Sequence, residues 1–217
     1  LKISPPITAT RINGAANQGT PLAYYNLHGL ADAAEWYGQR DPVDGTTGPD
    51  YPIALRPQDI LNHGSAPKIV FSEACFGANV IDKAVEEAIC LKFLDSGSKA
   101  VIGSTCTSYG SIAAPLIAAD LLGKAFWSYT QEGYPVGESL RRAKIHLARE
   151  MNKRQGYLDG EDQKTLISFV LYGDPLATAS PSGLSSQPKS HLQPAFDPDK
   201  IKTVCDKVNL MEKSQVP

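Results

Sequence analysis

The sequence is poor in cysteine. Its four cysteines, at positions 75, 90, 106 and 205, are too few and too irregularly spaced for a disulfide framework, and none forms a Cys-x-x-Cys pair of the kind that holds zinc. We therefore expect free thiols and no zinc site. A free thiol at the right place in a fold is also a candidate nucleophile.

The sequence also lacks a basic excess and a long hydrophobic run. The net charge is -2 and the pI about 6.1, and no cluster of Lys and Arg is interleaved with aromatic residues. These features argue against nucleic acid as a partner. No apolar run approaches the roughly 20 residues that span a bilayer, so we expect no transmembrane helix and no membrane partner.

The two ends of the chain differ from its middle. The first residues have neither the charged nor the apolar region of a signal peptide and no initiator Met, which favours a processed chain. Beyond Ala179 the composition shifts to Ser, Pro, Gly and Gln, which is typical of a linker. We predict one domain over residues 1–179, with its core at 22–179, and a linker and tail over 180–217.

Hydrophobic patterns in the middle of the chain alternate between strand and helix. We expect strands at 22–27, 68–74, 99–104 and 165–172, helical turns at 30–37, helices at 79–96 and 112–131, and a helix that buries Leu140, Ala143, Leu147 and Met151. A loop over 38–52 is expected beside His28. This alternation predicts an α/β fold with a mostly parallel sheet that is covered on both faces.

The predicted topology brings three strand ends together. Right-handed crossovers place the residues after Leu27, Ala74 and Gly103 on the same edge of the sheet, which is where parallel α/β sheets bind ligands. His28, Cys75 and the segment 104–106 are therefore expected to converge.

Cys75 is the candidate nucleophile of this edge. A thiol reacts as thiolate, which a nearby base or a helix N-terminus favours; His28 and a helix beginning near Asn79 would supply these. Gly29 would let backbone amides approach an oxyanion. A lone cysteine at a strand end is often only a small buried residue, and a lone histidine is often structural. The pairing of both, each at a strand end and close to a glycine, favours catalysis.

The loop at 38–52 carries three carboxylates, from Asp41, Asp44 and Asp50. Oxygen ligands of this kind could hold a structural calcium ion. Their spacing does not match an EF-hand, which favours a solvated surface loop instead.

Two short motifs resemble those of a known family. Tyr24-Tyr-Asn-Leu-His-Gly29 and Glu73-Ala-Cys-Phe-Gly77 are similar to the His-Gly and Ala-Cys motifs of caspase-like (clan CD) cysteine peptidases, most of all to the gingipains, with kinship to CHAT domains. The resemblance covers roughly residues 22–179 and includes a strand like 99–104, a helical stretch like 121–149 and a closing Gly-Asp-Pro at 173–175. It implies a caspase-like three-layer α/β/α sandwich and peptide-bond hydrolysis without a cofactor.

The resemblance also implies roles for single residues. Cys75 would attack the carbonyl carbon, His28 would activate the thiol or protonate the leaving amine, and the amides of Gly29 and Cys75 would hold the oxyanion. By similarity to legumain-like peptidases and metacaspases, Glu73 would line the pocket for the P1 side chain and favour Lys or Arg, with Asn as second choice. Ser104 and Thr105 would form one pocket wall. Alternatively, Glu73 caps local backbone amides.

The chain departs from the family pattern at its start. Residues 1–20 are too short to supply the strands and the upstream S1 acid that gingipains carry before the His-Gly strand, so we expect an N-terminal chain or domain of the same precursor as a partner. A secreted or cell-envelope location is favoured over the cytoplasm. Two alternatives stay open: a CHAT-type intracellular protease within a larger signalling protein, and an inactive scaffold or interaction module.

Overall fold

The computed structural model describes residues 20–40, 47–61, 64, 66–111 and 114–179. All of them belong to one structural unit, Leu1–Leu184. The predicted linker and tail at 180–217 lie outside the described residues. Within the described part, no helix combines the length and apolar character needed to cross a membrane.

A four-stranded sheet forms the centre of the fold. Its order is β1 (Leu22–Tyr25), β5 (Ile69–Ser72), β6 (Ala100–Ser104) and β7 (Phe169–Gly173), with β1, β5 and β6 parallel and β7 antiparallel to β6. Side chains alternate along β5, so that Ile69 and Phe71 enter one core cluster and Val70 the other. Burial on both faces explains the uninterrupted apolar run, and the predicted mostly parallel sheet is confirmed.

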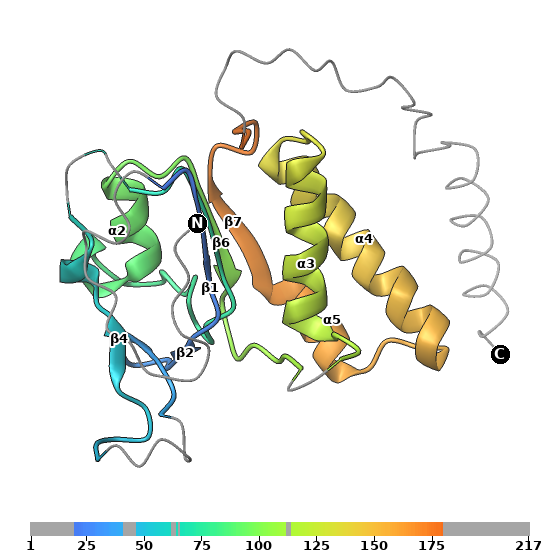
Figure 1. Ribbon diagram of the computed structural model, residues 1–217, viewed down its shortest axis with the longest axis horizontal. Coiled ribbons are helices and arrows are strands. Elements are labelled where there is room, and N and C mark those ends of the chain that lie inside the picture. Colours follow the sequence, from blue (N-terminus) through green and yellow to red (C-terminus); the bar gives the residue numbers. More distant parts are fainter. Residues whose placement is uncertain (1–19, 41–46, 62–63, 65, 112–113, 180–217) are drawn as a thin grey trace, which may run out of the picture. The chain divides into compact units, whose positions relative to one another are not determined.

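Helices cover one face of this sheet, and a helix with a small second sheet covers the other (Figure 1). The first layer contains α3 (Ala118–Gln131), α4 (Val136–Gln155) and α5 (Gly160–Ser168). The second contains α2 (Ile89–Asp95) and the 3-10 turns η1 (Pro57–Asp59) and η2 (Val85–Glu87). The predicted three-layer α/β/α architecture is confirmed, as is a helix that buries the four predicted apolar positions of α4.

The small sheet was not expected from the sequence. It pairs β2 (His28–Gly29), β3 (Trp36–Tyr37) and β4 (Ile53–Leu55) in antiparallel order. The prediction of helical turns at 30–37 is wrong, because Trp36 is extended and packs its buried ring 5.5 Å from that of Tyr25. This sheet carries the candidate base, His28.

The segment after the Cys75 strand is less helical than its apolar pattern indicates. Residues 79–84 are not helical; Asp82 has a left-handed backbone (φ 55°), and Ile81 is 76% exposed instead of buried. Regular α-helix begins only at Ile89. The prediction that a helix starting near Asn79 directs its N-terminus at Cys75 is therefore wrong.

Two other boundaries differ from the prediction. Strand β7 begins at Phe169, not at 165, because residues 160–168 form α5. The side chain of Asp159 caps this helix by accepting a hydrogen bond from the Asp162 amide (2.9 Å). Helix α3 begins at Ala118, after the interruption that the sequence placed near Pro115.

Candidate active site

The ends of β1, β5 and β6 lie side by side at one edge of the central sheet. The Glu73 amide donates to the Tyr25 carbonyl (2.8 Å), which ties the segment after β5 to the end of β1. On its other side, the Phe76 amide donates to the Cys106 carbonyl (2.9 Å). The Cys75 segment is thus held between the two neighbouring strand ends, as the topology predicts.

Gly29 packs directly against the backbone of Cys75. A Cβ atom at Gly29 would lie 2.1 Å from the Cys75 carbonyl oxygen and 3.2 Å from the carbonyl carbon. No residue with a side chain fits at such a distance, so only glycine allows this approach. The contact brings the backbone that carries His28 against the backbone that carries Cys75.

His28 is exposed and is held by the loop that follows it. Its Nε2 lies 3.2 Å from Oε1 of Gln39, and its ring meets the Tyr51 ring edge-on, with centroids 5.0 Å apart. The Gln39 side-chain amide thus occupies one of the two ring nitrogens of His28. Among the described residues, no hydrogen bond joins the His28 ring to the Cys75 thiol.

The Cys75 thiol is half-buried and contacts the backbone of Ser108. The Ser108 amide donates to Sγ at 3.3 Å, and the thiol donates to the Ser108 carbonyl at 3.5 Å. The Ser108 hydroxyl is buried and has no hydrogen-bond partner among the described residues. The loop after β6 therefore holds the sulfur through the backbone of Ser108.

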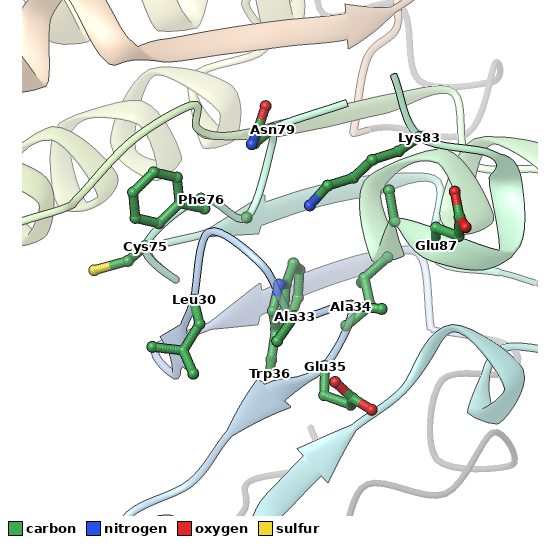
Figure 2. A pocket seen from close by; sticks show the side chains of 13 residues that line it. Leu30, Ala33, Ala34, Glu35, Trp36, Cys75, Phe76, Asn79, Lys83 and Glu87 are labelled. Carbon is green, nitrogen blue, oxygen red and sulfur yellow. The ribbon is translucent and has the colours of Figure 1, made fainter. Parts of the chain in front are cut away.

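A pocket lies on the other side of the Cys75 backbone (Figure 2). Residues from two segments line it: 30–36 from the start of the small sheet, and 75–89 after β5. The Cys75 sulfur points away from the other labelled side chains in Figure 2, in agreement with its contacts to Ser108. This pocket consequently does not enclose the thiol.

Glu73 is 7% exposed and faces helix α3. The Tyr24 hydroxyl donates to its Oε1 (2.5 Å), and the Asp120 carboxyl lies close enough to hydrogen-bond with it. Burial raises the pKa of Glu73 to about 8; the Tyr24 hydrogen bond opposes this rise, and the neighbouring Asp120 adds to it. Burial, with the Glu73 charge as a second cause, also raises the pKa of Tyr24.

The alternative in which Glu73 caps backbone amides has no support in the described contacts. The hydrogen bond that it accepts there comes from a side chain, the Tyr24 hydroxyl. Gly123 of α3 lets the helix approach, since a Cβ atom there would lie 2.9 Å from Glu73 Oε1. The result is a buried Glu73 carboxyl, two residues from the thiol in the sequence, with the half-buried Asp120 carboxyl of α3 beside it.

Ser104 and Thr105 support the loop after β6. The Ser104 hydroxyl is fully buried and donates to the Cys106 carbonyl (2.8 Å), with the Ser168 hydroxyl 3.0 Å away. The Thr105 hydroxyl donates to the Ser168 carbonyl (3.3 Å). Both hydroxyls thus hold this loop against the end of α5. Their predicted contact with a substrate stays a prediction.

The other cysteines and the other histidine that the structure describes are less suited to catalysis. Cys90 is fully buried in α2, and burial raises the pKa of its thiol to about 12. Cys106 is half-buried beside Cys75, but its thiol donates to the carbonyl of its own neighbour Thr107 (3.7 Å). His146 is exposed on α4, far along the chain from the strand ends.

The predicted calcium loop lies mostly outside the described residues. Asp41 and Asp44 are not described, and the third candidate ligand, Asp50, forms an ion pair with Arg40 (2.5 Å). In the described stretches, no group of three or more His, Cys, Asp or Glu side chains could hold a metal ion. The calcium site therefore remains an untested prediction.

Comparison with protein families agrees with this arrangement. Residues 3–180 match the model of peptidase family C25, which spans both candidate catalytic residues and all strands of the fold. The chain belongs to peptidase family C25. This is the gingipain family of clan CD, so the chain is a cysteine peptidase, a hydrolase whose substrates are proteins or peptides. A comparison with curated proteins found none that matches the chain.

Sequence reasoning missed two residues of this C25 peptidase that contact the predicted site. Ser108 lies in the loop after β6, and Asp120 lies in the first turn of α3. Tyr24 was within reach of prediction: it pairs with Phe71 in the parallel register, and side chains two residues apart share a face, so Tyr24 and Glu73 are near neighbours.

Proposed function

We propose that this chain is an endopeptidase in which Cys75 is the nucleophile and His28 the acid–base partner, with cleavage after Arg or Lys. The observation that carries the proposal is the contact between Gly29 and the Cys75 backbone, because it brings together the two strand ends that bear these side chains. Membership of family C25 supplies the reaction class.

The reaction divides into acylation and deacylation. The Cys75 thiolate attacks the scissile carbonyl carbon, so that a C–S bond forms and an oxyanion develops, to which we assign the amides of Gly29 and Cys75 as donors. Collapse breaks the C–N bond, and His28 gives its proton to the leaving amine. Water then adds to the thioester, releases the new carboxylate and returns the proton to the thiol.

The proposed P1 preference rests on the buried Glu73 carboxyl, which has the half-buried Asp120 beside it. A carboxylate that is removed from water is costly unless a cation or hydrogen bonds compensate it. Neither Glu73 nor Asp120 forms an ion pair with a described residue. With its pKa near 8, Glu73 holds a proton at neutral pH in the free protein. A P1 guanidinium or ammonium group would take the place of that proton.

Covalent labelling tests the nucleophile. A peptidyl acyloxymethyl ketone with arginine at P1 is expected to add once per chain, because the thiolate displaces the carboxylate leaving group and forms a C–S bond. Mass spectrometry of the intact chain, followed by peptide mapping, should place the adduct on Cys75. Cys106 is the internal control, as a half-buried thiol on the neighbouring strand end. An unmodified Cys75 would support the inactive scaffold instead.

Substitution of Glu73 tests the P1 preference. Glu73→Gln is expected to lower kcat/KM for substrates with Arg or Lys at P1 by about 10²-fold, since truncating one partner of a buried charge pair costs about 2–5 kcal/mol. Alkylation of Cys75 by iodoacetamide, which has no P1 side chain, should change little. Glu132→Gln, at an exposed position, is the matched control. Identical P1 profiles for wild type and Glu73→Gln on a peptide library would remove Glu73 from the pocket.

A further inference from the structure

The buried Ser108 hydroxyl is the polar group of this site that the reaction described above leaves without a role. The hydroxyl oxygen is removed from solvent and has no hydrogen-bond partner among the described residues. Buried polar atoms without a partner are uncommon, since each has lost its hydrogen bonds to water. The same residue touches the nucleophile twice through its backbone, by donating to Sγ (3.3 Å) and by accepting from it (3.5 Å).

The two backbone contacts act in opposite directions on the thiol. The Ser108 carbonyl accepts the S–H hydrogen and so stabilises the neutral thiol, whereas the Ser108 amide stabilises the thiolate. When Cys75 gives up its proton, the contact with the carbonyl is lost. The sulfur then needs a second donor.

We propose that the Ser108 hydroxyl is this second donor, and that it turns toward the Cys75 sulfur when the thiolate forms. The hydroxyl oxygen of Ser108 is bonded to Cβ, and Cβ is bonded to the Cα next to the donating amide. Rotation about χ1 moves this oxygen among staggered positions around the Cα–Cβ bond. The Cys75 sulfur lies 3.3 Å from the nitrogen bonded to that Cα, so we infer that one of these positions brings the hydroxyl to the sulfur. The inference rests on the proposed function, because it assumes that Cys75 is the nucleophile.

The hydroxyl changes its bonding state between the two forms of the nucleophile. It is unpartnered beside the thiol, and it gains a charge-assisted hydrogen bond beside the thiolate. The thiolate form of Cys75 thereby has a favourable contact that the neutral thiol lacks. The proton that Cys75 loses passes to His28 or to water. Ser108 makes the thiolate accessible at a lower pH than the backbone contacts alone would.

Other ionisable groups near Cys75 also act on the thiol, and the test must hold them constant. His28 belongs to β2, Cys106 to the loop after β6, and Glu73 to the same segment as Cys75 but faces α3. The pocket behind the Cys75 backbone adds Glu35, Lys83 and Glu87. A substitution of Ser108 alters none of these charges, so a change in the ionisation of Cys75 reports the hydroxyl.

The experiment measures iodoacetamide alkylation of Cys75 in the full chain between pH 5 and pH 10, with peptide mapping to separate it from the other cysteines. In Ser108→Ala, the midpoint of the pH–rate profile is expected to rise by about one unit, which lowers the rate about tenfold below the wild-type midpoint. Ser108→Thr keeps a hydroxyl and should restore the midpoint. Thr107→Ala, which removes a neighbouring hydroxyl from the same loop, should leave it unchanged.

The isosteric variants Ser108→Thr and Ser108→Val separate loss of the hydroxyl from misfolding. They have the same shape and differ only in that Thr carries a hydroxyl where Val carries a methyl group. Equal midpoints in this pair, or an Ala variant that titrates within 0.2 units of wild type, would overturn the role of the hydroxyl. That result differs from failure of the proposed function, in which the peptidyl ketone would leave Cys75 of the unsubstituted chain unmodified.

Discussion

Replacing either member of the proposed dyad, as in Cys75→Ala or His28→Ala, is expected to lower kcat/KM for peptide hydrolysis by about 10³-fold or more. The alanine at 75 has no nucleophile, and the alanine at 28 leaves the thiol without its base and the leaving amine without its acid. Residues that act as one catalytic unit give non-additive losses. The double variant should therefore be no less active than the worse of the two single variants.

Matched controls separate this loss from general damage. Cys106→Ala removes a half-buried thiol at the next strand end, and His146→Ala removes an exposed histidine from α4. Both should keep kcat/KM within about twofold of wild type, as expected for substitutions away from the reacting atoms. A His28→Ala protein that retains more than a tenth of the wild-type rate would exclude His28 as the acid–base group.

The central sheet was predictable because its inner strands, β5 and β6, are buried on both faces. A strand with a core on each side requires apolar residues at every position, and the run Ile69-Val70-Phe71 shows this without interruption. Helix α4 was predictable for the related reason that its four buried apolar positions repeat every three or four residues. Strand order and connection rules then located the edge at which Gly29 approaches the Cys75 backbone.

Short elements escaped prediction where tertiary packing overrides local pattern. Trp36 is drawn into β3 by contacts with Tyr25 and Phe93, which lie far from it in the sequence. Val80 and Ile81 fit a helical spacing, but only Val80 packs against a core cluster, while Ile81 is exposed. Apolar periodicity alone does not show whether a residue has anything to pack against.

The polar neighbours of the site depend on loops, and no sequence pattern fixes a loop. Asp120, in the first turn of α3, lies beside Glu73 and accepts a hydrogen bond from the Ser111 amide of the preceding loop. Ser108 reaches Cys75 through the same loop. The topology was enough to predict which residues lie at the strand ends. The contacts of Asp120 with Glu73, and of Ser108 with Cys75, required the structure.

Gly29→Ala is expected to lower kcat/KM by about 10²-fold or more while the chain still folds. Its new Cβ would lie 2.1 Å from the Cys75 carbonyl oxygen, so the two backbone segments must move apart. A displacement of about 1 Å at a reacting centre costs about 10²-fold in rate. Overpacking of this kind costs about 1–3 kcal/mol of stability, which a domain with about 5–15 kcal/mol of stability survives.

Gly160→Ala is the matched control for Gly29→Ala, because no atom lies within 4 Å of a Cβ built at Gly160. It should change neither kcat/KM nor the urea midpoint appreciably. If Gly29→Ala keeps wild-type kcat/KM and wild-type stability, the close contact does not position the dyad, and the proposed function loses the observation that carries it. If it loses rate far more than stability, the approach of Gly29 to Cys75 serves catalysis, since a purely structural contact would affect unfolding first.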